Sequence, residues 1–542
     1  MTHGVFRVPT PTNEPIKGFA PGSPERESLS ARVASLSGEV PEIPLIIGGK
    51  EVRTGDMVDV VMPHKHSHVI AKAHMAGPAE AKLAVDAAEA ARHDWSSLPW
   101  EERAAVLLRA ADLLCGPWRD TINGATMIGQ SKTCHQAEID AACEMADFFR
   151  YNAQYATQIY EEQPDSAPGL WNRLEHRPLD GFVFAITPFN FTSIAGNLCT
   201  APALMGNTVV WKPSTTALLS NYHTMRLLEA AGMPPGVINF LPGGGAPIGD
   251  VVTPDHRLGG VHFTGSTRTF QHIWKQVGNN IEGYGQYPRI VGETGGKDFV
   301  FVHPSACGAR EVAVALARGS FEFQGQKCSA ASRAYVPKSM WPDVKEQLGE
   351  ILSEMKMGDV ADFSNFISAV IDQNSFNKLK AAIDRSKAES NVDVVFGGGC
   401  DDSEGFFVEP TVAVVQDPKH DLMHSEYFGP LLGVYVYDDN RVEETLELCA
   451  NTSPYALTGA VFADDRYAVR QALDALRFAA GNFYINDKPT GAVVGQQPFG
   501  GSRASGTNDK AGSILNLLRW VSPRTIKETF VPPTDWRYPF LG

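Results

Sequence analysis

The stretch from 181 to 211, GFVFAITPFNFTSIAGNLCTAPALMGNTVVW, carries no charged residue and opens the part of the chain that decides the fold. Pro188, Asn190 and Pro202 interrupt it, so no apolar run reaches the ~20 residues that a bilayer requires. The pattern predicts a buried strand, a loop, a buried helix and a second strand. We therefore expect no membrane span and no membrane partner.

Strands and helices alternate from this stretch onward. We expect strands at 182–186, 208–211, 237–241, 259–263 and 289–293. The helices expected between them lie near 194–205, 216–231, 246–253 and 267–279. Short connections between alternating strands and helices indicate a parallel sheet covered on both faces, and a second α/β pattern follows over about 294–490.

The flanking segments lie outside these two α/β units. Residues 1–42 are rich in Pro, Ser and Gly, with a short helical pattern around 25–36, and predict an extended arm. Segments 160–180 and 518–542 resemble strands with charged faces, and the chain ends in an aromatic tail with Trp536, Tyr538 and Phe540. Because these strands have no core of their own, we expect them to build a subunit interface.

Composition excludes several classes of protein. The chain has 542 residues, 43% of them hydrophobic and 20% charged, which suits roughly two to four globular domains and excludes a disordered chain. Its 47 basic and 62 acidic residues give a net charge of −15 without a basic cluster. We therefore expect no nucleic-acid partner.

The eight cysteines form no C-x-x-C pair, which argues against a disulfide scaffold and a zinc site. His64, His66 and His68 alternate on an extended stretch, which fits an exposed turn better than a metal site, so we expect no metal. The N-terminus has no apolar signal core, and its acidic residues argue against a transit peptide. These features predict a reducing, cytoplasmic location.

Cys328 differs from the other cysteines in its surroundings. The segment FQGQKCSA at 323–330 places it in a polar turn. A nearby cation or helix terminus would lower the pKa of this thiol and favour the nucleophilic thiolate. The spacing by itself also fits a thiol hydrolase that pairs Cys328 with a histidine.

Two further polar residues follow predicted strands. Glu293 ends an apolar strand and precedes two glycines, so it is either a general base in a cleft or a solvated cap. Asn190 lies between two phenylalanines, where its amide either satisfies loop backbone or points at a developing oxyanion. The turn at Gly265 and Ser266 opens a helix and could hold an anion.

Together these pieces resemble the aldehyde dehydrogenase superfamily. The family's order is kept in WKPS (211–214), FTGS (263–266), EYFGP (426–430) and QPFGG (497–501), across roughly 45–510. PFNF, FQGQKCSA, the stretch 480–510 and LRWVSPRTIKET (518–529) are similar to the branch that oxidises L-glutamate γ-semialdehyde, which forms from Δ1-pyrroline-5-carboxylate in proline degradation.

The resemblance implies an α/β fold with a Rossmann-type parallel-sheet cofactor domain, an α/β catalytic domain and a small β flap for oligomerisation. The implied division is an N-terminal arm at 1–42, an NAD-binding domain at 43–159 and 181–291, a catalytic domain at 292–502, and an oligomerisation segment at 160–180 and 503–542. It also implies a homodimer or a larger homo-oligomer. A proline dehydrogenase would be a partner in the pathway.

The resemblance implies a thioester mechanism as well. Cys328 would attack the aldehyde, Asn190 would hold the oxyanion, and Glu293 would activate the hydrolytic water. The implied NAD-binding residues are Lys212, Gly265, Ser266, Glu426 and Phe428. The implied substrate-binding residues are Ser329, Gly491, Ala492, Phe191 and Phe499.

Two positions depart from the family's pattern. Thr215 stands where many members have a glutamate that binds the ribose 2′-hydroxyl, which weakens the case against NADP. Ala492 has no hydroxyl, so it can bind a carboxylate only through its backbone. The alternatives are an NAD(P)-dependent enzyme for another carboxylated semialdehyde and a non-catalytic protein with the same fold. A coenzyme-A-dependent enzyme is disfavoured because it would not need Glu293.

Overall fold

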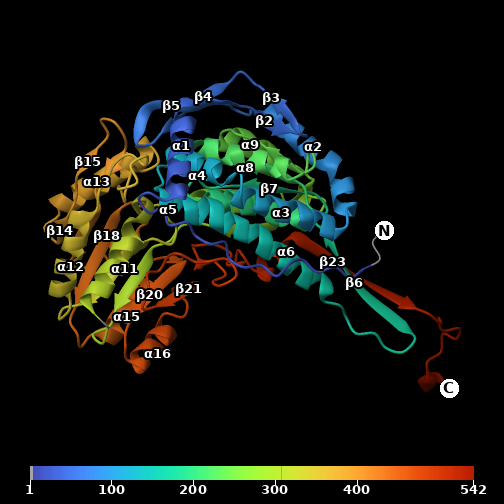
Figure 1. Ribbon diagram of the computed structural model, residues 1–542. Helices are drawn as coiled ribbons and strands as arrows, with labels where there is room; N and C mark the ends of the chain where they lie inside the picture. The colour runs from blue at the N-terminus through green and yellow to red at the C-terminus, as the bar shows by residue number, and fades with distance from the viewer. Residues whose placement is uncertain (1–3, 307) are drawn as a thin grey trace.

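The computed structural model describes residues 4–306 and 308–542 and contains two seven-stranded sheets (Figure 1). The first sheet has the order β11-β10-β7-β8-β9-β2-β3. Its strands are β2 (Leu45–Ile47), β3 (Lys50–Val52), β7 (Phe182–Ile186), β8 (Val209–Lys212), β9 (Ile238–Phe240), β10 (Leu258–Thr264) and β11 (Arg289–Glu293). Strands β7 to β11 are parallel, as the alternating pattern predicts.

Helices cover both faces of this sheet. One face packs against α2 (Pro78–Ser97), α9 (Gly245–Val252) and α10 (Thr267–Asn279). The other packs against α3 (Trp100–Cys115), α4 (Arg119–Gln130), α6 (Met145–Glu161), α7 (Thr192–Leu204) and α8 (Leu218–Ala230). Between 182 and 293, every expected strand and helix is confirmed to within two residues at each end.

The second sheet has the order β14-β17-β18-β13-β12-β20-β21. Its strands are β12 (Asp298–Val302), β13 (Ala331–Pro337), β14 (Val392–Phe396), β17 (Thr411–Val415), β18 (Leu431–Tyr437), β20 (Thr458–Phe462) and β21 (Asn482–Ile485). Helices α11 (Ala309–Phe321) and α12 (Trp341–Glu354) cover one face. Helices α13 (Gln373–Ala388), α15 (Val442–Asn451) and α16 (Arg466–Ala475) cover the other.

The chain order of the first sheet places a crevice at its carboxyl edge. The chain runs from β7 outward through β8 and β9, then returns to the other side of β7 for β10 and β11. Open parallel sheets bind ligands where the strand order reverses in this way. The crevice therefore lies outside the carboxyl ends of β7 and β10, the strands that precede Asn190 and Gly265.

Smaller elements join and extend the two sheets. A three-stranded sheet contains β1 (Glu42–Ile43), β4 (Met57–Met62) and β5 (Lys65–His74), and α1 (Pro24–Gly38) packs on α4. The remaining short elements are α5 (Cys134–Ala137), the π-helix η1 (Glu138–Glu144), β15 (Cys400–Asp401), β16 (Phe407–Val408), α14 (Asp421–His424), β19 (Tyr455–Ala456), β22 (Ser502–Arg503) and α17 (Ile514–Leu517).

A long two-stranded antiparallel ribbon extends away from the body of the molecule (Figure 1). We call it the hairpin, although its two strands are far apart in the sequence. Strands β6 (Leu170–Pro178) and β23 (Val521–Thr529) pair antiparallel over nine residues each, from Leu170 opposite Thr529 to Pro178 opposite Val521. The two strands expected outside the cores are confirmed. No helix among the described residues is long and apolar enough to cross a bilayer.

Candidate active site

Cys328 follows a turn whose backbone is held in an unusual conformation. Phe323, Gln324 and Gly325 have φ values of 49°, 55° and 65°, a left-handed run that is unfavourable for the two residues with side chains. A Cβ at Gly325 would lie 2.4 Å from the Gly429 carbonyl oxygen, so only glycine fits there. The Gln324 amide donates to the carbonyls of Ser131 and Ala369, which fixes the turn before Cys328.

The pKa of the Cys328 thiol is raised, whereas the sequence predicted a lowered value. Burial raises the pKa of its thiol well above the usual value, and the nearby carboxyls of Glu293, Asp298 and Glu426 raise it further. Lys327 does not offset this, because its ammonium pairs with Glu322 at 2.8 Å. The expectation of a lowered pKa is therefore wrong for the protein alone, since burial outweighs the adjacent cation.

A cavity of about 420 Å³ opens beside Cys328. Six of the predicted residues line it: Cys328, Ser329, Phe191, Gly491, Ala492 and Phe499. The hydroxyls of Ser329 and Thr490 lie 2.7 Å apart, which joins the cysteine turn to the loop that contains Gly491. The structure thus brings the predicted nucleophile and all five predicted substrate-binding residues to one cavity.

Asn190 lies close to the cysteine turn but outside the cavity lining. It is buried between β7 and α7, and its side-chain amide donates to the Gln326 carbonyl at 3.1 Å. One amide hydrogen is thereby used on the backbone two residues before Cys328, and the amide carries a second. Asn190 can therefore bond to the loop backbone with one amide hydrogen and to a developing oxyanion with the other.

Glu293 ends β11 beside the same turn. Its Oε1 lies 2.8 Å from the position that a Cβ on Gly500 would take, and its Oε2 is buried without a hydrogen-bond partner among the described residues. Burial raises its pKa well above the usual value, Lys510 opposes this, and Asp509 adds to it. A carboxyl poised in this way can take a proton from water more readily than a solvated cap can.

Three of the predicted cofactor residues lie at the carboxyl edge of the first sheet. Lys212 ends β8, and burial lowers the pKa of its ammonium to about 8. Gly265 follows β10, and the Ser266 hydroxyl accepts the Thr269 N–H as the N-cap of α10. The free end of α10 and a buried ammonium suit an anionic dinucleotide.

Glu426 and Phe428 approach this edge from the second sheet. The Gly296 N–H donates to the Glu426 carboxylate at 2.8 Å, and a Cβ on Gly295 would lie 2.1 Å from the other oxygen. The ring of Phe428 meets that of Phe189 edge-on at 5.8 Å. The five predicted cofactor residues thus lie outside the cavity lining. They lie on three segments: the end of β8, the turn between β10 and α10, and the segment between α14 and β18.

The sequence reasoning missed residues from two other segments that line the cavity. Asn13, Glu14 and Ile16 come from the N-terminal arm, and Glu144 and Asp147 come from η1 and the start of α6. Burial raises the pKa of Glu144 to about 8. No sequence signal marked the arm, because it carries no periodic pattern. A helical run that contains four acidic residues could have drawn attention to η1.

A buried ion pair lies in the wall of the cavity, and its carboxylate residue, Asp140, is one of the lining residues. The Lys132 ammonium lies 2.6 Å from Asp140 and lies over the rings of Phe191 at 4.1 Å and Phe323 at 4.4 Å. Asp140 also accepts the N–H groups of the first two residues of α7. One carboxylate thus neutralises the lysine and caps the helix that follows Phe191.

The three alternating histidines each have a different partner. His64 lies 2.8 Å from the Ser131 hydroxyl, His66 contacts the Asp402 carbonyl and His68 contacts the Ser37 carbonyl. His64 is buried, so the expectation of an exposed turn is wrong for this residue. In the described part of the chain, no group of three metal-ligating side chains comes together. Cys307 lies outside the described residues.

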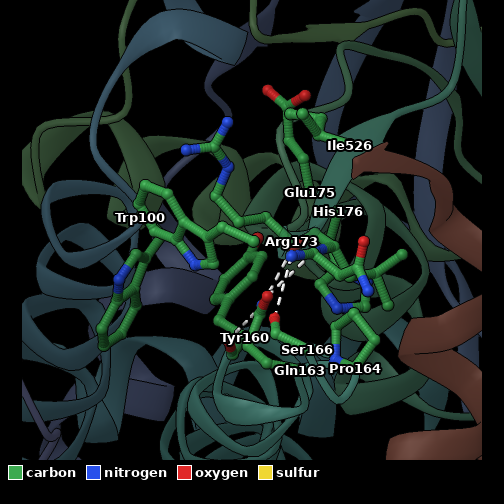
Figure 2. Close-up of a pocket in the computed structure, with 12 residues that line it drawn as sticks. Trp100, Tyr160, Gln163, Pro164, Ser166, Arg173, Glu175, His176 and Ile526 are labelled. Carbon is green, nitrogen blue, oxygen red and sulfur yellow. Dashed lines mark hydrogen bonds between the residues drawn. The ribbon is translucent and has the colours of Figure 1, made fainter. Parts of the chain in front are cut away.

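A second recess lies beside the hairpin, and most of its lining residues belong to β6 and the loop that precedes it (Figure 2). Its volume is about 740 Å³, and Trp100, Tyr160 and Trp171 are among its lining residues. Both ring nitrogens of His176 are buried there without a partner among the described residues. None of the predicted site residues lines this recess.

Comparison with known proteins gives consistent matches. A sequence model described as "Aldehyde dehydrogenase family" matches residues 51–526. A mitochondrial Δ1-pyrroline-5-carboxylate dehydrogenase of Dictyostelium discoideum is 52% identical over 98% of this chain and 96% of its own. The human mitochondrial enzyme of that name is 50% identical over 98% of this chain and 94% of its own.

A solved structure agrees with these matches. The Δ-pyrroline-5-carboxylate dehydrogenase of Mycobacterium tuberculosis bound with NAD is 57% identical, with a TM-score of 0.96 over 100% of both chains. The expected α/β fold and the family resemblance are confirmed. The cytoplasmic location is contradicted, because the relatives from Dictyostelium and human are described as mitochondrial. Cysteines without a disulfide pattern and an N-terminus without an apolar segment do not distinguish the cytoplasm from the mitochondrion.

Proposed function

The chain belongs to the aldehyde dehydrogenase family, and on that basis we propose that it oxidises L-glutamate γ-semialdehyde to L-glutamate with NAD as the cofactor. This reaction follows the formation of Δ1-pyrroline-5-carboxylate in proline degradation. The observation that carries the proposal is the cavity that holds Cys328 together with Ser329, Gly491 and Ala492. This arrangement fits a small substrate with an aldehyde at one end, beside Cys328, and a carboxylate at the other end, beside the backbone of Gly491 and Ala492.

The crevice of the first sheet fits NAD. Lys212 is a buried ammonium that forms no ion pair with any described carboxylate, and the N-terminus of α10 provides free N–H groups behind Ser266. Glu426 is an acceptor for ribose hydroxyls on the opposite wall. When bound there, NAD supplies the hydride acceptor of the reaction.

Cys328 carries the covalent step. Its sulfur, as thiolate, bonds to the aldehyde carbon, and the aldehyde oxygen becomes an alkoxide. The second amide hydrogen of Asn190 and the backbone N–H of Cys328 stabilise that oxygen. Loss of hydride from the same carbon restores the carbonyl as a thioester on Cys328.

Glu293 completes the cycle. Its carboxylate takes a proton from water, and the water oxygen bonds to the thioester carbon while the bond to sulfur breaks. The products are a carboxylic acid and the free thiolate of Cys328. Because burial raises the pKa of Glu293, the group also holds this proton readily before releasing it to solvent.

The far end of the substrate is held by backbone and hydroxyl donors. We assign the α-carboxylate to Ser329 and the N–H groups of Gly491 and Ala492, and the methylenes to Phe191 and Phe499, all of which line the cavity. A simple alkyl aldehyde leaves these donors unpaired, at about 1–3 kcal/mol for each buried group. The protein carries a net charge of −15, so these short-range donors provide the recognition of an anionic substrate.

We further propose that the chain assembles as a homodimer or larger homo-oligomer through the hairpin of β6 and β23. Trp171, Trp536 and Phe540 are 48%, 80% and 82% exposed in the single chain, and the hairpin has no core of its own. The division into domains given above remains a proposal of the same kind. A proline-oxidising enzyme is a partner through the shared metabolite.

The deciding experiment follows NADH absorbance with Δ1-pyrroline-5-carboxylate, propanal and succinate semialdehyde, and repeats each assay with NADP. We expect kcat/KM to favour Δ1-pyrroline-5-carboxylate over propanal by at least ~100-fold, or ~2.7 kcal/mol. Equal values would retain the mechanism and reject the substrate. If no aldehyde gives NADH, a non-catalytic protein is favoured. Equal rates with NAD and NADP would show that the enzyme, which has Thr215 in place of the family's glutamate, does not prefer NAD.

A further inference from the structure

We propose that the N-terminal arm completes the active site, and that Asn13 is a positioning residue for the loop that binds the substrate carboxylate. The inference rests on the proposed function, because it assigns a role in the same cavity. The arm runs as an extended trace along α6 before it reaches α1 (Figure 1). Asn13, Glu14 and Ile16 line the cavity that contains Cys328.

Asn13 uses its whole side-chain amide to join two elements. Its nitrogen donates to the Asp147 carboxylate on α6 and to the Val494 carbonyl, both at 2.8 Å. Its oxygen accepts from the Gln496 amide at 2.9 Å and from the Tyr151 hydroxyl at 3.4 Å. Val494 and Gln496 belong to the loop that begins with Gly491 and Ala492, so Asn13 links this loop to α6.

The loop is otherwise held mainly from its other end. The Ser329 hydroxyl contacts Thr490 at 2.7 Å, and Lys488 donates to the Thr490 carbonyl at 3.2 Å. Within the loop, the Val493 N–H donates to the Gln497 side chain at 2.9 Å. Gly491 and Ala492 therefore lie between a fixed point on the cysteine turn and a second fixed point at Asn13.

The arm is itself fixed firmly enough to act as a support. The Glu14 N–H donates to Asp147 at 2.8 Å, and the Glu14 carboxylate pairs with Arg119 at 2.6 Å and with Arg150 at 2.8 Å. Further along the arm, the Lys17 N–H donates to Glu138 at 2.8 Å. Charge-assisted bonds of this kind, shielded from water, are stronger than ordinary ones. Asn13 is thus presented to the loop by a rigid segment.

A positioning role predicts a substrate-dependent effect. In Asn13→Ala the loop loses two side-chain bonds, so we expect KM for Δ1-pyrroline-5-carboxylate to rise roughly fivefold to twentyfold with kcat nearly unchanged. Propanal has no carboxylate to meet Gly491 and Ala492, so its kcat/KM is expected to stay the same. Gln496→Ala removes one bond from the loop side, and a smaller change in the same direction is expected.

The matched control is Thr12→Ala, which alters an exposed neighbour of Asn13 on the same arm and is expected to behave as the wild type. Amide hydrogen exchange, followed by mass spectrometry over 488–497, provides a readout that needs no substrate. We expect faster exchange there in Asn13→Ala than in the wild type and in Thr12→Ala. Unchanged exchange would overturn the inference, and so would an equal loss of activity on both aldehydes.

Failure of the proposed function looks different. A wild-type enzyme that does not prefer Δ1-pyrroline-5-carboxylate over propanal would reject the substrate assignment, whatever the variants do. The exchange measurement would then still test, without any substrate, whether Asn13 holds the loop in place. If Asn13→Ala does not fold, Gln496→Ala carries the same two readouts.

Discussion

The two recesses of the molecule differ in volume and in the segments that line them. The groove beside the hairpin has a volume of about 740 Å³, and the cavity beside Cys328 has about 420 Å³. The larger one is lined mostly by one stretch of chain, from the end of α6 through the following loop to β6, and by Trp100 of α3 and Ile526 of β23 (Figure 2). The smaller one gathers residues from the arm, η1, α7, the cysteine turn and the loop after β21.

Convergence of distant segments, and not volume, marks the proposed reactive site. Only the smaller recess holds the proposed nucleophile, Cys328, and Glu293 beside it has a strongly raised pKa. Perturbed titratable groups are expected where catalysis is set up, because burial and neighbouring charges tune their protonation. The hairpin groove offers exposed aromatic surface, which suits packing against protein.

The largest expected effect is loss of the nucleophile. Cys328→Ala should reduce the NADH-forming rate by at least ~10⁴-fold, because no thioester can form without the thiol. Binding of NAD, measured by calorimetry, should stay within about twofold of the wild type. Cys400→Ala is the control, since that cysteine lies on β15, outside the cavity. Appreciable turnover in Cys328→Ala would reject Cys328 as the nucleophile.

The next effect tests the ion pair of Lys132 and Asp140 in the wall of the cavity. Asp140→Ala leaves the buried Lys132 ammonium unpaired and removes an acceptor from the first turn of α7. We expect the free energy of unfolding to fall by about 3–5 kcal/mol, measured by urea denaturation.

The control for this prediction has the same chemistry at the surface. Lys380 and Asp384 form an ion pair at 2.7 Å, and both side chains are about half exposed. Asp384→Ala should change the free energy of unfolding by less than about 0.5 kcal/mol, since water solvates the remaining lysine. Similar losses in the two variants would contradict the structural role given to Asp140.

Removal of the proposed general base, Glu293, should give a somewhat smaller effect on the rate. Glu293→Gln should slow steady-state turnover by about 10²–10³-fold, and the acyl thioester on Cys328 should become visible by intact mass. Burial raises the pKa of Glu293, so the active carboxylate form is gained as pH rises through that raised pKa. The wild-type rate of thioester hydrolysis should therefore rise with pH, while the variant's rate stays flat. A steady-state rate like that of the wild type would reject the assignment.

The smallest effect on activity is expected at the hairpin. Trp171→Glu places a charge on the exposed aromatic surface of β6, where the Arg173 guanidinium now lies 3.9 Å from the Trp171 ring centre. We expect light scattering to show a shift of the oligomer toward the 58.8 kDa monomer, while kcat stays within about threefold. Tyr467→Glu on α16, at another exposed aromatic residue, is the control. A wild-type chain that is already monomeric would reject the proposed interface.

Much of the fold was predictable because its signals are local. The uncharged stretch at 181–211 and the regular alternation that follows it determine β7 to β11 and the helices between them, since each element buries a face set by its own periodicity. The hairpin strands were predictable in the same way. The pairing of β6 with β23, more than 300 residues apart in sequence, was not predicted, because the sequence indicated only that both segments lie outside the two cores.

The reactive residue types were also determined by the sequence. The local pattern left alternatives open for three residues, and the resemblance to the family implied their roles. A cysteine in a polar turn, a glutamate at a strand end and an asparagine after a buried strand were nevertheless recognisable as candidates from their neighbours. Their protonation was not, because the pKa of Cys328 depends on burial and on carboxyls that arrive from other segments. The sequence suggested a lowered pKa from Lys327, whose charge the fold pairs with Glu322.

Only the tertiary structure decided which distant residues complete the site. The arm at Asn13 and the buried pair of Lys132 and Asp140 carry no periodic pattern or motif, and their roles arise from contacts over long sequence separations. Local physics specifies helices, strands and turn chemistry, because these depend on neighbours in the chain. Burial, electrostatics and the support of a binding loop depend on what packs around a group, and that is fixed only when the whole chain folds.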